Sequence, residues 1–384
     1  MPQTAHQSAE TIETPTEGAT LAQARQLIEH HLQSLWAHPE WAEQIPPLML
    51  WSAPGVGKST LIRQLCHEHG IGFVDIRLAQ REPIDLRGLP VPRGDAVHWL
   101  LASEWPRDPA SRGIILFDEL TAADRSLQVA AYELILDRRL GDLYRVPDGW
   151  YICAAGNRSQ DRAVATTLSS ALANRFCHLE VLPDQGAWHR WAQDNGLHPE
   201  VIAFLNFRPD CFFDMDGDVE RGWPSPRSWE RVSTALHLAG AGPLGPACLR
   251  LQITGLVGRG AATELLAFRQ WARELPDVGR MLRGKATIRI PQRADQRYAL
   301  CAAMVHHLWR GPDTERETLL AGFFRISEQL PSDFAAMAMI DALTGPDEAT
   351  SQARSERLMG HPRFEAWTRR HGQAFAAQGG GQWL

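Results

Sequence analysis

The feature that most constrains this chain is the stretch from Trp51 to Ser59, which reads Trp-Ser-Ala-Pro-Gly-Val-Gly-Lys-Ser. A short apolar run at residues 47–51 leads into it and is typical of a buried parallel strand. Residues 60–67 follow with apolar side chains at helical spacing. A strand, a glycine-rich turn and a helix in this order predict a phosphate-binding loop. The alternative is a chance turn of glycine, lysine and serine before a helix.

Each residue type in this loop suits a nucleotide phosphate. Gly55 and Gly57 allow the backbone to curl so that its N–H groups point at a phosphate, and the helix dipole adds positive potential. Lys58 would reach the β- and γ-phosphates of ATP, and the Ser59 hydroxyl would hold Mg²⁺. The chain has only two lysines, Lys58 and Lys285, so this ammonium group stands out against the arginines used elsewhere. The expected nucleotide-binding residues are Pro54, Gly55, Val56, Gly57, Lys58, Ser59 and Thr60.

A second anchor is the apolar run within residues 111–120, which ends in Asp118 and Glu119. In an open α/β sheet, ligands bind beyond the carboxyl ends of the strands. Asp118 would therefore hold the hydration shell of Mg²⁺, and Glu119 would take a proton from the attacking water. Without the preceding loop, an exposed Asp-Glu pair at a strand end would carry little information.

Three later positions complete the expected site. Asn157 follows a strand predicted over residues 150–155, where its amide would orient water near the γ-phosphate, although asparagine is also a common turn residue. Arg175 ends a short helix predicted over residues 168–176. There it would either cap the helix or act on the phosphate of a neighbouring subunit. Arg227 lies at a helix start that Pro226 predicts.

The pattern along the chain predicts four regions. Residues 1–20 have almost no large apolar side chain and are expected to be disordered. Residues 21–183 predict an α/β nucleotide-binding core, a parallel sheet flanked by helices. A hairpin predicted within residues 82–101 interrupts this core, either as a functional insertion or as an idle surface loop. Residues 184–300 predict a helical lid, and residues 301–384 predict a helical C-terminal region with a flexible tail.

Composition narrows the classes of function. At 384 residues, with 44% hydrophobic and 22% charged residues, the chain is ordinary for a globular protein. A net charge of −6 argues against wholesale nucleic-acid binding. Residues 280–297 are nevertheless basic and form either a solvated face or a docking surface. The sequence has no long apolar run, no secretory signal pattern and no C-x-x-C pair among its six cysteines, so we expect a cytoplasmic protein that spans no membrane.

Taken together, these motifs resemble those of the AAA+ ATPases and, within them, the MoxR family. The matching segments occur in the same order and lie within residues 21–240: Gly55–Ser59, Leu116–Glu119, Ala155–Asn157, Ala173–Phe176 and Ser225–Ser228. The hairpin within residues 82–101 is similar to the helix-2 insert of that clade. The resemblance implies a P-loop NTPase core of AAA+ type, followed by an all-α lid.

The resemblance also implies a role for each site residue. It makes Asp118 the Mg²⁺ ligand, Glu119 the general base, Asn157 sensor one, Arg175 an arginine finger acting in trans and Arg227 sensor two. It implies an ATP hydrolase that forms a hexameric ring and remodels a protein client, often beside a protein with a von Willebrand factor A domain. The chain departs from the family at Ser52, where a glycine is usual, and at Thr121-Ala-Ala, where relatives commonly carry Asn-Arg-Ala. The second departure leaves the local contacts between subunits open.

Two other classes of function remain. A nucleic-acid motor or clamp loader would share this core, and the basic residues 280–297 favour it, whereas the acidic net charge and the lack of a recognition motif disfavour it. A nucleotide-gated scaffold without turnover is disfavoured by the presence of both Glu119 and Arg175. We therefore expect ATP and Mg²⁺ as cofactors. The expected partners are further copies of this chain and a protein client, without membrane or nucleic-acid binding.

Overall fold

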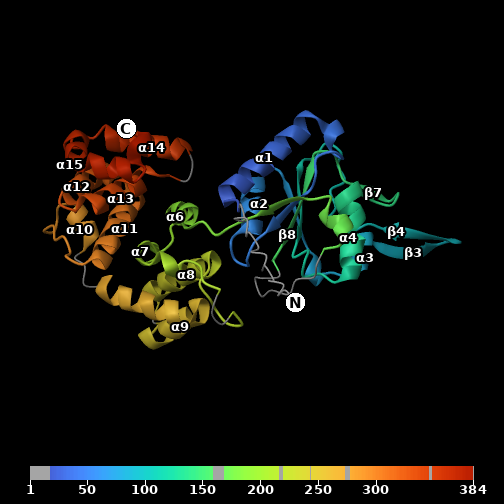
Figure 1. The fold of residues 1–384 in the computed structure, drawn as a ribbon, viewed down its shortest axis with the longest axis horizontal. Helices are drawn as coiled ribbons and strands as arrows, with labels where there is room; N and C mark the ends of the chain where they lie inside the picture. The colour runs from blue at the N-terminus through green and yellow to red at the C-terminus, as the bar shows by residue number, and fades with distance from the viewer. Residues whose placement is uncertain are drawn as a thin grey trace, which may run out of the picture. The chain divides into compact units, whose positions relative to one another are not determined.

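The computed structural model describes residues 18–158, 168–215, 219–242, 244–272, 277–345 and 348–383. The chain forms two units, which are described separately (Figure 1). The first consists of residues 1–54 and 58–182, and the second of residues 183–384 together with Gly55–Gly57. Residues 1–20 were predicted to be disordered. Of these, residues 1–17 lie outside the described residues.

The first unit is built on a parallel sheet of five strands in the order β2-β5-β8-β1-β9. Its strands are β1 (Leu48–Trp51), β2 (Gly72–Arg77), β5 (Gly113–Asp118), β8 (Trp150–Gly156) and β9 (Cys177–Glu180). Its helices are α1 (Leu21–Ala37), α2 (Lys58–Glu68), α3 (Pro83–Arg87), α4 (Arg125–Asp137) and α5 (Ser170–Ala173). The predicted fold class, a parallel sheet flanked by helices and followed by a helical region, is confirmed.

Both faces of this sheet are covered, which explains why its strands read as continuous apolar runs. Met49, Ile115 and Ile152 pack on one face with the buried side chains of α4. The other face is covered by α1 and α2, whose Ile28 and Ile62 are fully buried. Figure 1 shows α1 and α2 on one side of the sheet and α4 on the other.

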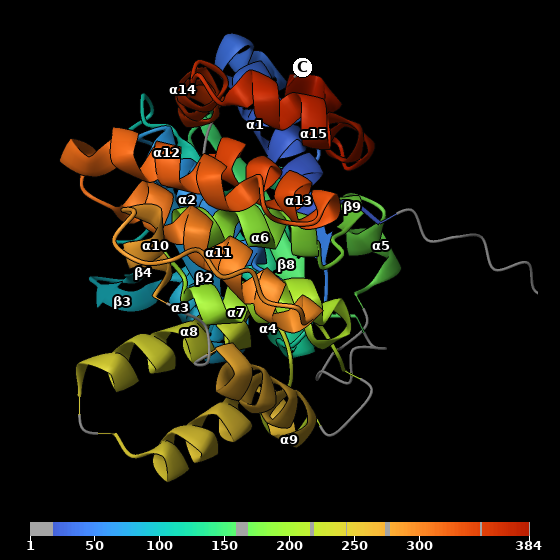
Figure 2. The same ribbon diagram turned by 90° about the vertical axis from the view of Figure 1, so that its left-hand side faces the viewer.

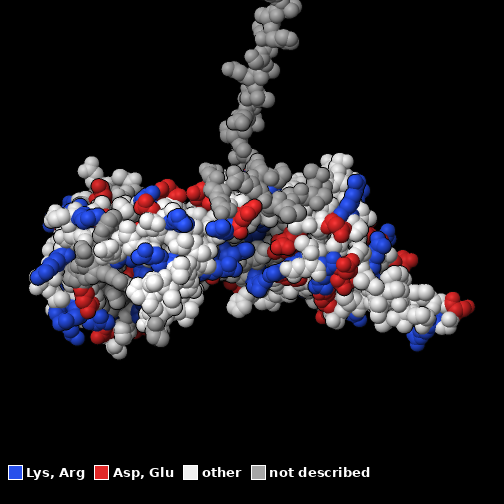
Figure 3. Space-filling view, turned by 90° about the horizontal axis from the view of Figure 1, so that it is seen from below, with Lys and Arg blue, Asp and Glu red and all other residues white. Residues whose placement is uncertain are grey.

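Two hairpins project from the first unit. The longer one, β3 (Leu89–Arg93) and β4 (Ala96–Leu100), turns through Gly94, whose φ of 65° favours glycine. It is the hairpin predicted within residues 82–101. The shorter one pairs β6 (Arg139–Leu140) with β7 (Tyr144–Arg145). Figure 3 shows the longer hairpin as an arm with mostly uncharged sides and a tip that carries charges of both signs.

The described part of the second unit is entirely helical. Its longer helices are α6 (Gln185–Asp194), α7 (Pro199–Phe207), α8 (Pro226–Ala241), α9 (Pro246–Ala272), α11 (Ala294–Arg310), α12 (Arg316–Ser327), α13 (Ser332–Leu343), α14 (Glu348–Met359) and α15 (Phe364–Ala377), and α10 (Val278–Leu282) is short. Figure 2 shows α8 and α9 below the helices α10 to α13. Gly258, with φ of 75°, interrupts α9 with a kink. Among the described residues, no helix has the length and apolar character to cross a bilayer.

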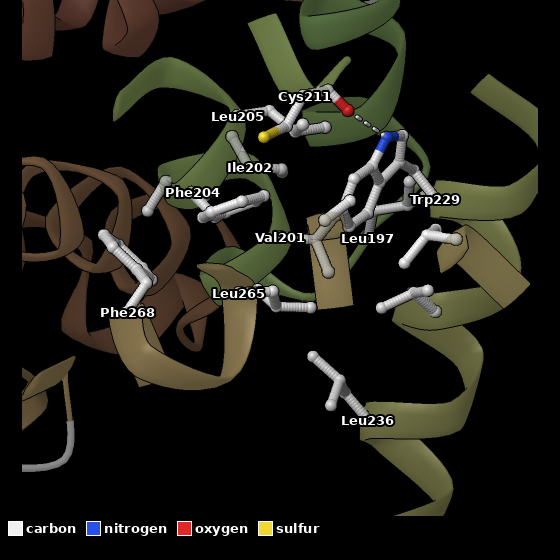
Figure 4. Packing of buried hydrophobic residues seen from close by; sticks show 14 of the residues in the cluster. Leu197, Val201, Ile202, Phe204, Leu205, Cys211, Trp229, Leu236, Leu265 and Phe268 are labelled. Carbon is white, nitrogen blue, oxygen red and sulfur yellow. Dashed lines mark hydrogen bonds between the residues drawn. The ribbon is translucent and has the colours of Figure 1, made fainter. Parts of the chain in front are cut away.

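Two hydrophobic clusters hold the second unit together. The first forms mainly between α6, α7, α8 and α9 around the fully buried Trp229, whose indole Nε1–H donates to the Cys211 carbonyl at 3.0 Å (Figure 4). The second lies among α10 to α15. At the C-terminus, Gly380–Trp383 forms a 3₁₀ turn, and Trp383 packs against this second cluster. The flexibility expected of this tail stays a prediction.

Candidate nucleotide site

The predicted phosphate-binding loop connects β1 to α2. The strand ends at Trp51 and the helix begins at Lys58. Gly55 and Gly57 have φ of 81° and 114°, in the region where any other residue would be strained. Residues 54–60 are thus a glycine turn that runs into the first turn of a helix, an arrangement whose backbone N–H groups suit a phosphate.

The ammonium group of Lys58 is buried and held by oxygen atoms. Its Nζ donates to the Ser52 hydroxyl at 2.8 Å, to the Ser52 carbonyl at 2.9 Å and to the Asn157 side-chain oxygen at 3.3 Å. Ser52 is itself fully buried. The serine that stands where the motif usually has a glycine therefore contacts Lys58 directly.

Ser59 and Asp118 meet at the carboxyl edge of the sheet. The Ser59 hydroxyl donates to Asp118 Oδ2 at 2.6 Å, and the Glu119 backbone N–H donates to Asp118 Oδ1 at 2.9 Å. Mg²⁺ prefers oxygen ligands and is usually held by one or two protein groups together with water and substrate phosphates. The described residues contain no cluster of three histidine, cysteine or acidic ligands. The Ser59 hydroxyl beside the Asp118 carboxylate fits a Mg²⁺ ion that shares the phosphates of ATP.

Glu119 has an unusual backbone. Its φ of 56° places a glutamate in the left-handed region directly after β5, and its side chain is half-buried. Non-glycine residues in this region store of order 1–3 kcal/mol of strain, and such residues cluster at active sites. The strained turn continues with a hydrogen bond of 2.9 Å from the Ala122 N–H to the Glu119 carbonyl.

Asp75 is a site neighbour that we did not predict. It lies on β2, next to β5, where burial raises the pKa of its carboxyl and the negative charge of Asp118 raises it further. Arg63 pairs with it at 3.2 Å. The available sequence signal was a carboxylate between Val74 and Ile76, two apolar residues of the strand.

Asn157 follows β8 and is tied to the turn after β5. Its backbone N–H donates to the Thr121 hydroxyl at 3.2 Å, while its side-chain oxygen accepts the bond from Lys58. Lys58, Ser59, Asp118, Glu119 and Asn157 are thus gathered at one edge of the sheet, as the sequence predicted. The bond from Thr121 was not predicted, because nothing in the local sequence shows which strand ends meet.

Arg175 lies elsewhere in the same unit. It follows α5, is exposed, and lines a cavity of about 340 Å³ together with Pro47, at the entry to β1, and Tyr151, at the start of β8. These neighbours belong to the amino-terminal ends of the strands, whereas Lys58 lies beyond the carboxyl ends. Among the described residues, no hydrogen bond or ion pair engages its guanidinium group. The structure therefore does not bring Arg175 to the phosphate loop of its own chain.

Arg227 belongs to the second unit. It occupies the first turn of α8 and is exposed. Ser225 and Ser228 cap this helix reciprocally, with hydrogen bonds of 2.8 Å and 3.2 Å between backbone N–H and side-chain hydroxyl. The capping fixes the helix start and leaves the Arg227 side chain toward solvent.

Comparison with known proteins gives only distant similarities. No protein-family model and no curated protein matches the sequence. The chain is similar to NtrX from Brucella abortus in complex with ATP, at 15% identity over 86% of this chain and 68% of that one, with a TM-score of 0.35. It is similar to a RuvB variant from Thermotoga maritima, at 15% identity over 67% and 74% of the two chains, with a TM-score of 0.31.

Three further solved structures show similarity of the same distant kind. The AAA domain of FIGL-1 with ADP has 14% identity over 68% of this chain and 85% of that one, with a TM-score of 0.36. The chain spans 64% of a candidate ATPase from Cytophaga hutchinsonii and 66% of another NtrX structure. With TM-scores this low, the similarities assign neither a family nor a function to this chain, so those rest on its own residues.

Proposed function

We propose that this chain is a Mg²⁺-dependent AAA+ ATPase of the MoxR type. It would couple ATP binding and hydrolysis in an oligomeric ring to the remodelling or activation of a partner protein. One observation carries the proposal. At one edge of a parallel sheet, Lys58 Nζ donates to the Asn157 side-chain oxygen at 3.3 Å, and the Ser59 hydroxyl donates to Asp118 at 2.6 Å. The strained Glu119 follows Asp118 directly. A lysine, a metal-binding hydroxyl and carboxylate, a base and an amide are the parts that phosphoryl transfer to water needs.

Each residue has a distinct task in this proposal. The N–H groups of residues 54–60 hold the phosphates, and the Lys58 ammonium exchanges its present oxygen partners for phosphate oxygens. Ser59 and Asp118 would hold Mg²⁺, which neutralises charge on the phosphates when bound. Glu119 accepts the proton of the attacking water, and the Asn157 amide orients that water.

The position of Arg175 supports catalysis between subunits. An exposed guanidinium at the opposite edge of the sheet from Lys58 cannot serve the loop of its own chain without rearrangement of the unit. It can instead stabilise charge on the phosphate of a neighbouring copy, the arrangement of an arginine finger supplied in trans. A ring is the closed assembly in which every copy both gives and receives such a residue.

The MoxR assignment and the client rest on the β3–β4 hairpin. It interrupts the chain between β2 and β5, where a helix alone would connect two parallel strands. Leu89, Val97 and Trp99 on this hairpin are 54%, 59% and 45% exposed. Exposed apolar side chains on a projecting arm favour a surface that meets another protein. The identity of that protein, including one with a von Willebrand factor A domain, stays a prediction.

The basic residues 280–297, which favoured the alternative of a nucleic-acid motor, support it less once their contacts are considered. Several basic side chains of residues 280–297 are engaged within the second unit: Arg283 pairs with Glu315 at 2.7 Å, and Arg293 pairs with Asp295 at 2.9 Å. Arg297 donates to the Pro291 carbonyl at 2.8 Å. Guanidinium groups that are tied to neighbouring groups in this way contribute less to a phosphate-binding surface.

ATP turnover by the purified chain tests the proposal. We expect hydrolysis that requires Mg²⁺, no hydrolysis and no ATP binding by Lys58→Ala, and no salt-sensitive binding of DNA. Glu119→Gln should bind ATP without turning it over and should retain the client when partners are isolated in ATP. Unchanged ATP affinity in Lys58→Ala would contradict the loop assignment, and tight salt-sensitive DNA binding would favour the alternative.

A further inference from the structure

Thr121 lies in the turn after Glu119 and is only 2% exposed. Its hydroxyl accepts a hydrogen bond from the Asn157 N–H at 3.2 Å and lies 3.3 Å from the Asn157 carbonyl, to which it donates. A hydroxyl can donate and accept at the same time, so this one side chain satisfies both backbone groups of Asn157. Thr121 thereby clamps the residue that follows β8 to the turn that follows β5.

The residues around the contact between Thr121 and Asn157 are tightly packed. A Cβ added to Gly156 would lie 2.8 Å from Thr121 Cγ2 and 2.7 Å from Met49 Cε, closer than real Cβ contacts. The absence of a side chain at Gly156 is what lets the turn approach the strand. A second bond, 2.9 Å from the Leu120 N–H to the Ala155 carbonyl, joins the same turn to β8.

We propose that Thr121 is a positioning residue for ATP hydrolysis, which sets the Asn157 amide relative to the Glu119 carboxylate. The inference rests on the proposed function, in which these two groups act on the same water molecule. Because both must reach one small molecule at hydrogen-bond distance, the spacing between their two backbone segments matters directly. Thr121 contacts neither ATP nor water in this account and acts through Asn157.

The test compares variants of the full chain that keep or lose the hydroxyl. Thr121→Val and Thr121→Ala should lower kcat roughly tenfold or more, the scale of a misplaced orienting group, with the Kd for ATP unchanged. Thr121→Ser should restore most of kcat. The control is Thr234→Val, which removes a hydroxyl that donates to the Glu230 carbonyl of its own helix. This variant should change neither kcat nor the Kd for ATP. Equal losses of activity in Thr121→Ser and Thr121→Val would overturn the proposal. Because both Thr121→Val and Thr121→Ala lack the hydroxyl, the comparison can still be made if one of them fails to fold.

A double-mutant cycle tests whether Thr121 acts through Asn157. In an Asn157→Ala background, Thr121→Val should cause little further loss of kcat, because the group that it positions is already gone. Independent, multiplying losses would overturn the proposal. Hydrogen exchange at the Asn157 amide should be faster in Thr121→Val and normal in Thr121→Ser. A wild-type chain without ATP turnover would overturn the proposed function and this role together, whereas an active wild type with a fully active Thr121→Val would overturn this role alone.

Discussion

The Ser59 hydroxyl donates a hydrogen bond of 2.6 Å to the Asp118 carboxylate, although 59 residues separate them in the sequence. The bond joins the first turn of α2 to the last residue of β5. It places two oxygen ligands suited to Mg²⁺ side by side. The relationship gives the proposed metal site its two protein ligands, one from each of the two motifs that the sequence singled out.

Replacing Asp118 with asparagine keeps the shape of the side chain and removes its charge. We expect Asp118→Asn to need at least roughly tenfold more Mg²⁺ for half-maximal ATP turnover, because a neutral amide is a weaker ligand than a carboxylate. Turnover measured across a Mg²⁺ titration checks this. Asp124→Asn is the control, since Asp124 caps α4 through its side chain and asparagine caps equally well. The same Mg²⁺ dependence in Asp118→Asn and wild type would rule Asp118 out as a ligand.

The left-handed backbone of Glu119 predicts that this residue lowers the stability of the chain while its carboxylate supports ATP hydrolysis. The free energy of unfolding should be higher for Glu119→Gly than for Glu119→Gln, by up to about 1 kcal/mol. Glycine adopts a positive φ without strain, and its larger loss of entropy on folding offsets part of this gain. Both variants should hydrolyse ATP at least roughly a hundredfold more slowly than wild type. Urea unfolding of the two variants makes the comparison. A clearly less stable glycine variant would show that the turn is unstrained.

The Ser52 hydroxyl should contribute to stability through Lys58. Ser52→Ala removes one of the oxygen partners of a buried ammonium group, so we expect the free energy of unfolding to fall by about 1–3 kcal/mol. Ser103→Ala, at an exposed turn position, is the control and should change the free energy of unfolding by less than about 0.5 kcal/mol. Equal stability of the two variants would indicate that the other partners of Lys58 hold its ammonium group without the Ser52 hydroxyl.

Much of this architecture is readable from the sequence because its signals are local. The strands β1, β5 and β8 and the helix α4 follow from apolar runs, and the phosphate loop follows from its glycines and lysine. The helix expected over residues 168–176 is shorter, at Ser170–Ala173, because neighbouring packing rather than pattern sets where such a short helix begins and ends.

The parts that sequence reasoning missed depend on contacts between distant segments. The bonds from Ser52 to Lys58 and from Thr121 to Asn157 exist only because particular strand ends become neighbours in the sheet. The same limit left the two interpretations of Arg175 open, since the sequence alone does not say at which edge of the sheet a residue lies. The kink at Gly258 was likewise not predicted, because a single glycine in a helical pattern is usually tolerated.

Acidification should destabilise the second unit through His198. Burial lowers the pKa of this histidine from 6.5 to about 4, and its Nδ1 accepts a hydrogen bond from the Glu200 N–H at the start of α7. The unfolded chain therefore binds a proton more readily than the folded chain between these two pKa values, so the stability that His198 supports falls as the pH drops from 6.5 towards 4.

The variant His198→Asn isolates this effect. Asparagine also caps a helix but does not titrate, so the loss of unfolding free energy between pH 7 and about pH 5 should be smaller than in wild type. His30→Gln, at an exposed position on α1, should leave the pH dependence unchanged. An identical pH profile for His198→Asn and wild type would contradict the assignment.

Catalysis shared between subunits is the central claim, and a mixture of two inactive variants tests it most directly. Arg175→Ala should retain ATP affinity and lose most hydrolysis, and Glu119→Gln should do the same, because each lacks a different half of the shared site. In mixed assemblies, an intact site forms wherever Arg175 of a Glu119→Gln subunit faces Glu119 of an Arg175→Ala subunit. We predict partial recovery of ATP turnover on mixing. A mixture that stays inactive while light scattering shows that mixed oligomers form would contradict the account, and Arg175 would then be a helix-capping residue.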